Sequence, residues 1–152
     1  MTTRTENTSS KQRRIRARRS AVQALYQWEM NNSDVEEILS EFLNERSEIK
    51  KADAEYFCEL VTGTLTNMAN LINELKPYLD RPIDLLDPVE RAVLLVGLYE
   101  LIYRPELPWR VVVNESVELA KMFGAEQSHK FINGVMDKVA HKIRSVEISN
   151  AS

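Results

Sequence analysis

The chain has 152 residues and a formal net charge of −3, but its charges are unevenly distributed. Residues 1–19 carry seven basic side chains and one acidic one, a balance of +6, whereas the remaining 13 basic and 22 acidic side chains leave the rest of the chain at −9. The length suits one domain with a hydrophobic core, and a hydrophobic content of 43% excludes a wholly disordered protein. No apolar stretch is long enough to span a membrane and no signal-peptide core is present, so we expect a cytoplasmic protein without membrane contact.

Helical patterns dominate between two polar ends. In chain order, we expect a disordered tail over residues 1–12, helices over about 13–30, 33–43, 53–76, 89–103, 111–123 and 128–143, and a frayed end over 147–152. The domain between these ends spans residues 13–146. Ser128 is expected to cap the last helix, and Gly134 to let that helix pack closely on a neighbour. The pattern predicts an all-α bundle of about six to seven helices.

The helix over residues 89–103 is apolar on most sides, which is typical of the buried centre of a bundle. Asp87 and Pro88 mark its start, because aspartate is a common N-cap and proline fits the first helical position. The three valines at 111–113 favour a strand by composition. We interpret them as helical, because no second strand is available and the apolar residues that follow keep the helical spacing.

Signatures of an enzyme or a metal site are missing from the sequence. It holds no phosphate-binding loop, dinucleotide-binding motif, zinc-protease motif or nucleophile elbow. Its only cysteine, Cys58, lies in an apolar helical stripe and is predicted to be inert, and His129 and His141 have no ligand cluster around them. Glu115 and Glu118 share a helix face, but exposed carboxylates on a helix are usually solvated charges and not a catalytic pair. We therefore expect no catalytic activity, no cofactor and no metal.

Six of the nine residues from Lys11 to Arg19 are basic, and five of those six are arginines. In a helix, like charges three and four residues apart repel by a few tenths of a kcal/mol per pair, and the helix dipole disfavours cations at its N-terminus. A bound phosphate backbone would reverse both penalties. We therefore predict that this segment is frayed when free and ordered when it binds a polyanion.

A solvated tail is the simplest alternative for a basic run, and a membrane surface is a second functional one. The run continues without a linker into an amphipathic helix, which fixes its charges relative to the core, and it lacks the apolar residues that membrane insertion requires. Arginine suits phosphate forks and base stacking. RNA is favoured over duplex DNA because no free recognition helix is predicted. Tyr26, which follows the arginines, fits either stacking on an unpaired base or packing in the core.

Three segments together are similar to a known family of bacterial proteins. They are RRIRARRSAVQALYQWEM over residues 13–30, ERAVLLVGLYEL over 90–101 and VVVNESVELAKMFGAEQSHKFINGVMDKVA over 111–140. Their order and spacing resemble the NusB family of antitermination factors, from about Arg13 to Arg144. The resemblance implies an all-helical fold in two sub-bundles, no catalysis, and binding of boxA RNA together with ribosomal protein NusE. It also implies assembly with other Nus factors on RNA polymerase, which suppresses termination in ribosomal RNA operons.

The resemblance further implies roles for individual residues. The residues implied to contact RNA are Arg13, Arg14, Arg16, Arg18, Tyr26, Lys130 and Phe131. Glu90 and Arg91 are implied to meet NusE.

Two alternatives stand beside this interpretation. NusB-like domains also occur in RNA cytosine methyltransferases, which carry a second domain that binds S-adenosylmethionine. The chain ends soon after its last recognisable helix, so we expect no such domain here. A structural dimerisation module would not need the basic N-terminus, although some family members self-associate, and a homodimer stays open.

Overall fold

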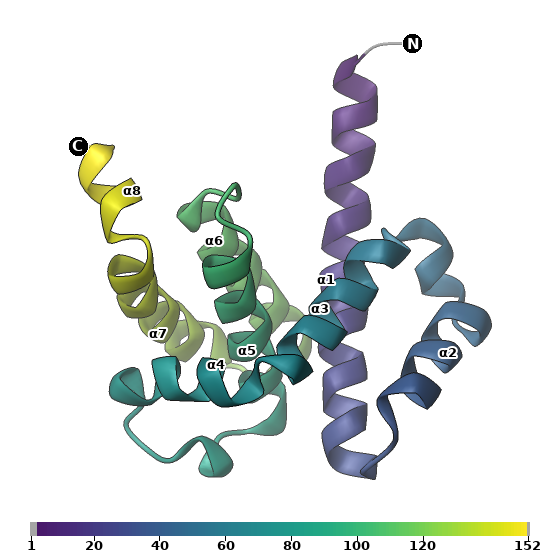
Figure 1. The fold of residues 1–152 in the computed structure, drawn as a ribbon, viewed down its shortest axis with the longest axis horizontal. Coiled ribbons are helices and arrows are strands. Elements are labelled where there is room, and N and C mark those ends of the chain that lie inside the picture. Colours follow the sequence, from purple (N-terminus) through teal and green to yellow (C-terminus); the bar gives the residue numbers. More distant parts are fainter. Residues whose placement is uncertain (1–2, 152) are drawn as a thin grey trace. The chain divides into compact units, whose positions relative to one another are not determined.

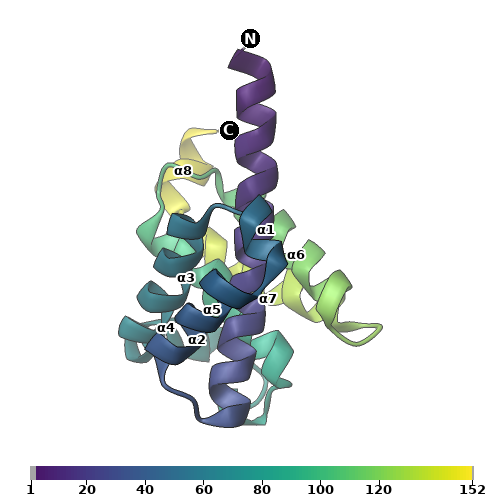
Figure 2. The ribbon, with the colours of Figure 1, turned by 90° about the vertical axis from the view of Figure 1, so that its right-hand side faces the viewer.

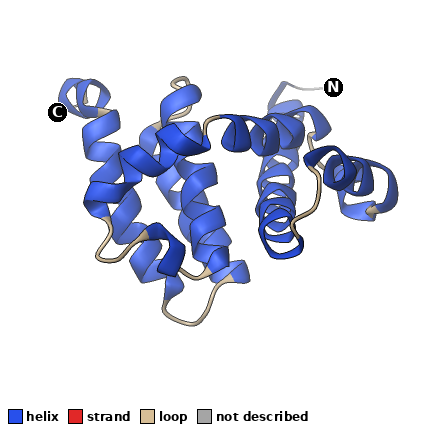
Figure 3. Cartoon of the chain, turned by 60° about the horizontal axis from the view of Figure 1, so that its bottom comes forward, coloured by secondary structure: helices blue, strands red, loops and turns tan. Residues whose placement is uncertain are grey.

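The computed structural model describes residues 3–151, with side chains from Ser10 onward. These residues form helices joined by short loops, and no strand occurs among them (Figure 3). This confirms the predicted all-α class. The chain divides between Thr66 and Asn67 into two compact units, as the two sub-bundles implied. No helix in the described part is long and apolar enough to cross a bilayer.

Unit 1 is built around one long helix. Its elements are α1 (Thr3–Asn31), α2 (Val35–Glu45), the 3-10 helix η1 (Ser47–Lys51) and α3 (Ala54–Thr66). Both α2 and α3 pack against α1 (Figures 1 and 2). The buried face of α1 carries small residues, Ala17, Ala21 and Ala24, which let the helices approach closely. Phe42 and Phe57 stack in the core with ring centres 5.5 Å apart.

The first helix starts at Thr3 rather than near Arg13. Neither glycine nor proline occurs before Gly63, so the sequence contains no residue that would end the helix earlier on its N-terminal side. The predicted disordered tail thus joins α1 from Thr3 onward, and its first two residues lie outside the described part.

Unit 2 has one helix at its centre and the others around it. Its elements are α4 (Met68–Leu75), η2 (Lys76–Tyr78), η3 (Ile83–Leu85), α5 (Pro88–Tyr103), α6 (Trp109–Phe123), α7 (Ser128–Ile143) and α8 (Ser145–Asn150). Helix α5 packs against α4, α6 and α7, and every residue from Ala92 to Leu101 is buried. This confirms the prediction for the apolar helix. The start of α5 is also as predicted, because Asp87 Oδ1 accepts a hydrogen bond from Val89 N at 2.8 Å.

Glycine allows the central helix of unit 2 to pack closely, but at a different position from the one predicted. A Cβ atom on Gly97 of α5 would lie 2.5 Å from Ser116 Oγ and 2.7 Å from Met136 Cε. Gly134, where close packing was predicted, is exposed and has nothing within 4 Å of such an atom. The prediction for Gly134 was wrong because helical spacing alone does not show which face of α7 meets α5.

Two helix boundaries also differ from the predictions. The expected helix over 53–76 is interrupted at Asn67, where α3 ends and α4 begins. Tyr103 Oη donates to Asn67 Oδ1 at 3.1 Å, a contact made from α5 that no local pattern reveals. The end predicted to fray, residues 147–152, largely belongs to α8, and Ser152 lies outside the described part.

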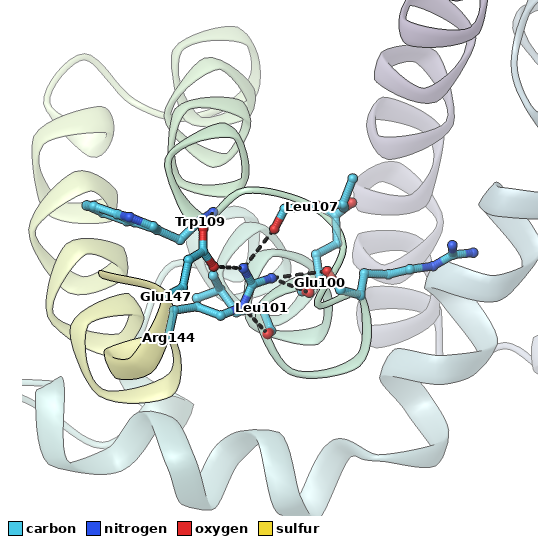
Figure 4. A network of polar contacts seen from close by, with 7 residues as sticks. Glu100, Leu101, Leu107, Trp109, Arg144 and Glu147 are labelled. Carbon is cyan, nitrogen blue, oxygen red and sulfur yellow. Dashed lines mark hydrogen bonds and ion pairs between the residues drawn. The ribbon is translucent and has the colours of Figure 1, made fainter. Parts of the chain in front are cut away.

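A buried arginine explains why the chain end is held. Arg144, only 6% exposed, donates to four carbonyl oxygens: Leu107 at 2.7 Å, Leu101 at 2.8 Å, Arg104 at 3.1 Å and Glu100 at 3.5 Å (Figure 4). The carbonyls at the end of a helix have no partner within it, and a cation there also complements the helix dipole. Arg144 therefore caps the end of α5 and fixes the loop that leads into α6.

Glu147 of α8 completes this arrangement, which we call the Arg144 clasp (Arg144 and Glu147). Its carboxylate pairs with Arg144 Nη1 and accepts a hydrogen bond from the backbone N–H of Trp109 at 3.1 Å (Figure 4). Burial on its own would raise the pKa of Glu147, but the hydrogen bonds from Trp109 and Arg144 hold it below its ordinary value. The clasp thus ties α8 to the first residue of α6.

Candidate nucleic-acid interface

The arginine-rich segment lies on α1, and its side chains differ in exposure. Arg13 is exposed, and Arg14, Arg16 and Arg19 are partly exposed. Arg18 is only 4% exposed, because it comes directly after Ala17 and so lies beside the buried alanine stripe of α1. The run therefore offers four accessible guanidinium groups, and the side chain of Arg18 lies inside unit 1.

Tyr56 of α3 organises two of these arginines. Its ring is 2% exposed, and the guanidinium carbons of Arg14 and Arg18 lie 4.7 Å and 5.8 Å from the ring centre. Such cation–π contacts stabilise by about 0.5–1 kcal/mol at exposed sites and more where water is excluded. We name the ring and these two arginines the Tyr56 platform. Only the helical position of Tyr56 was visible in the sequence, so sequence reasoning missed its role.

Backbone contacts hold the same stretch of α1. Arg13 Nη2 donates to Ala52 O at 3.3 Å, and Asp53 N donates to Arg13 O at 3.0 Å. Asp53 Oδ1 in turn accepts from Tyr56 N at 3.0 Å, which caps the start of α3. The segment is therefore ordered without a ligand, contrary to the prediction that it frays when free. The contacts that order it come from residues some 40 positions later in the chain.

Two other cations of the run are not paired with an acidic side chain among the residues whose side chains are described. Among the described residues, the side chains of Arg16 and Arg19 make no ion pair and no hydrogen bond. Their like-charge repulsion is therefore not neutralised within unit 1. Guanidinium groups fixed on a helix in this state are suited to accept phosphate oxygens in forked hydrogen bonds.

Tyr26 lies further along α1, and the structure separates the two interpretations of it. Its side chain is 40% exposed, so it is not a core residue. Met30, one turn later, is 54% exposed. An exposed aromatic ring with an apolar neighbour offers a surface on which a base can stack.

In unit 2, the predicted RNA-contacting pair starts helix α7. Lys130 is exposed, and Phe131 is partly buried beneath Arg81, whose guanidinium carbon lies 5.3 Å from the ring centre. Arg81 also pairs with Asp80 at 2.8 Å, and this hydrogen bond lowers the pKa of the Asp80 carboxyl. The loop before η3 thus brings a further cation to Phe131. Nothing in the sequence around Arg81 pointed to that role.

Glu90 and Arg91, predicted to meet NusE, both make contacts within unit 2. Glu90 Oε2 accepts a hydrogen bond from Ser128 Oγ at 2.7 Å, which joins the first turn of α5 to the first residue of α7. Ser128 therefore does not cap its own helix as predicted, and the N-cap position belongs to Gln127. Arg91 Nη1 donates to the carbonyls of Ile83 and Leu86, which fixes the turn around η3.

A metal site and a reactive cysteine are not formed in the described part of the chain. No group of three or more histidine, cysteine, aspartate or glutamate side chains there is arranged to hold a metal ion. Cys58 is partly exposed, and burial raises the pKa of its thiol, which disfavours the reactive thiolate.

Comparison with known proteins gives one consistent match. A model of the NusB family matches residues 15–141. The transcription antitermination protein NusB of Nitrosococcus oceani is 49% identical over 135 residues, which cover 89% of this chain and 90% of that protein. A T. maritima NusB structure matches with a TM-score of 0.74 and 33% identity, over 83% of this chain and 89% of that one. A chain from a structure of antitermination factors NusB and NusE in complex with double-stranded RNA matches with a TM-score of 0.70 and 26% identity, over 84% of this chain and 96% of that one.

Proposed function

The chain belongs to the NusB family, and from this premise we propose that it is a transcription antitermination factor that binds boxA-type single-stranded RNA together with ribosomal protein NusE. In this role it supports transcription of ribosomal RNA operons in the bacterial cytoplasm, within an RNA polymerase complex that holds other Nus factors. The role requires binding surfaces and no catalytic chemistry.

The set of accessible arginines on α1 is the observation that carries the proposal. Arg13 and Arg14 are held in place by contacts with Ala52 and Tyr56, and Arg16 and Arg19 have no partner among the described residues. Like charges fixed three and four residues apart on a helix repel each other by a few tenths of a kcal/mol per pair in the free protein. Binding a phosphate backbone removes that repulsion.

The number of accessible arginines sets the expected salt dependence. If four arginines each neutralise one phosphate of single-stranded RNA, the logarithm of the binding constant falls with the logarithm of salt at a slope of about −2.8. Raising salt from 50 to 200 mM then weakens binding about 50-fold. Replacing Arg16 and Arg19 by alanine should change the slope to about −1.4, and the same salt step should then weaken binding only about sevenfold.

A matched control removes the same charge elsewhere. Lys76 and Lys121 are exposed lysines of unit 2, and their double alanine variant should keep the slope of the unchanged protein. Fluorescence anisotropy of labelled boxA-type RNA measures both variants. Equal slopes for the two double variants would contradict the proposal. A duplex of the same RNA, titrated in parallel, tests whether the single strand is the preferred form.

The NusE part of the proposal concerns Glu90. Replacing Glu90 by lysine should weaken capture of NusE, whereas Glu90→Gln, which keeps an acceptor for Ser128 Oγ, separates the charge from the internal hydrogen bond. NusE capture that is unchanged in both variants would exclude Glu90 from the interface. Self-association as a homodimer is the competing role, and sedimentation velocity of the free chain measures it directly.

A further inference from the structure

A small hollow on unit 2 lies outside the proposed interface. Its volume is about 170 Å³, and it opens between the first turns of α6 and the middle of α7. Its walls are formed by Trp109, Arg110, Val113, Asn114, Asn133 and Asp137. None of these residues has a role in the function proposed above.

Flat and polar groups meet at this hollow. Trp109 is partly exposed, the guanidinium carbon of Arg110 lies 5.1 Å from its ring centre, and the His141 ring meets it edge-on at 5.2 Å. Among the described residues, the side-chain amides of Asn114 and Asn133 make no hydrogen bond. The hollow therefore combines planar groups with two amides whose donors and acceptors are unused.

The charge and the size of the hollow narrow the choice of ligand. Arg110 and the Asp137 carboxylate bring opposite charges, and Arg110 already lies over the indole, which disfavours a second cation there. A volume well below the roughly 300 Å³ of small cofactor pockets admits one ring system and no more. Proteins recognise unpaired bases with groups of the kind found here: aromatic or arginine planes stack on the base, and polar groups form hydrogen bonds to its edges.

The hollow is also fixed in place and connected to a proposed contact. Glu147 of the Arg144 clasp holds the backbone N–H of Trp109, while the indole points away from the clasp (Figure 4). Lys130, Asn133 and Asp137 follow one another at helical spacing, so they share a face of α7. The helical rise places Asp137 about 10 Å along that face from Lys130.

We propose that this hollow binds one unpaired nucleobase of the RNA whose backbone passes Lys130. The base stacks against Trp109 and Arg110, and Asn114 and Asn133 hydrogen-bond its edge. This inference rests on the proposed RNA-binding function. The hollow adds a base-recognising subsite to a surface whose other proposed charged contacts are to phosphate groups.

The test uses Trp109 as its own reporter. The chain has two tryptophans, so Trp28→Phe leaves Trp109 as the only one. This protein is titrated with fluorescein-labelled boxA-type RNA for anisotropy, and with unlabelled RNA for tryptophan emission. Emission of Trp109 should fall along the same binding curve as anisotropy rises. The double variant N114A/N133A should bind about tenfold more weakly with an unchanged salt slope, because it loses hydrogen bonds and no phosphate contact.

Asn73→Ala, which changes an exposed asparagine of α4, is the matched control and should bind as the unchanged protein does. RNA binding with steady Trp109 emission and an unaffected N114A/N133A variant would overturn the subsite and leave the proposed function standing. An emission change caused by an arginine-rich peptide and not by RNA would assign the hollow to a protein partner instead. A chain that binds no RNA at all would overturn both proposals.

Discussion

The Arg144 clasp predicts a large loss of stability when its arginine is removed. Arg144→Ala leaves the carbonyl oxygens of Leu101, Arg104 and Leu107 without their donor and leaves Glu147 without its cation. Each hydrogen bond from a charged group contributes about 1.5–3 kcal/mol, but such contributions are not additive. The side chain of Glu147 is 37% exposed and regains water, so most of the loss comes from buried carbonyl acceptors, each of which costs about 1–3 kcal/mol when it is left unsatisfied. We expect a total loss of about 3–5 kcal/mol.

For a chain of this size, that loss corresponds to a fall in melting temperature of roughly 6–20 °C. Urea unfolding measures the loss in free energy of unfolding. It is monitored by the emission of Trp109 in the Trp28→Phe background, because Trp109 lies beside the clasp. Arg144→Lys keeps the charge but not the fork, and should lose about half as much. A loss below about 1 kcal/mol for Arg144→Ala would refute the reasoning, because it would show that these carbonyls find water at no cost.

Four further outcomes follow from the contacts described. Tyr56→Leu should weaken RNA binding about three- to tenfold and flatten its salt slope in anisotropy titrations well below the melting temperature, whereas Tyr56→Phe should keep the ring and the affinity. Gly97→Ala should lower the free energy of unfolding by about 1–2 kcal/mol in urea titrations, because its Cβ would meet Ser116 Oγ. Gly134→Ala, with open space around it, should raise that free energy by about 0.5–1 kcal/mol in the same assay. Glu147 has a lowered pKa in the folded chain, so its contribution to stability is present above the ordinary glutamate pKa and is lost as pH falls through the folded value. Between pH 7 and pH 3, the melting temperature of Glu147→Gln should therefore fall less than that of the unchanged protein.

The candidate interface shows what a local sequence pattern can and cannot predict. The density of arginines from 11 to 19 was enough to predict a cationic surface on a helix, because charge and spacing are properties of the sequence itself. Which of these cations face solvent was not predictable. Arg18 lies four residues from Arg14 and looks equivalent in sequence, yet it is buried, because α3 packs on that side of α1.

The sequence by itself determined the helical class, the buried central helix from Pro88 to Tyr103 and the cationic stretch of α1 over residues 11–19, because each is set by composition and short-range periodicity. The tertiary structure decided the break at Asn67, the close packing at Gly97 and the clasp of Arg144. Each of these depends on a partner at least 19 residues away in the chain: Tyr103, Ser116 and Leu101, respectively. A periodic pattern shows which face of a helix is apolar, but only packing decides which atoms that face meets.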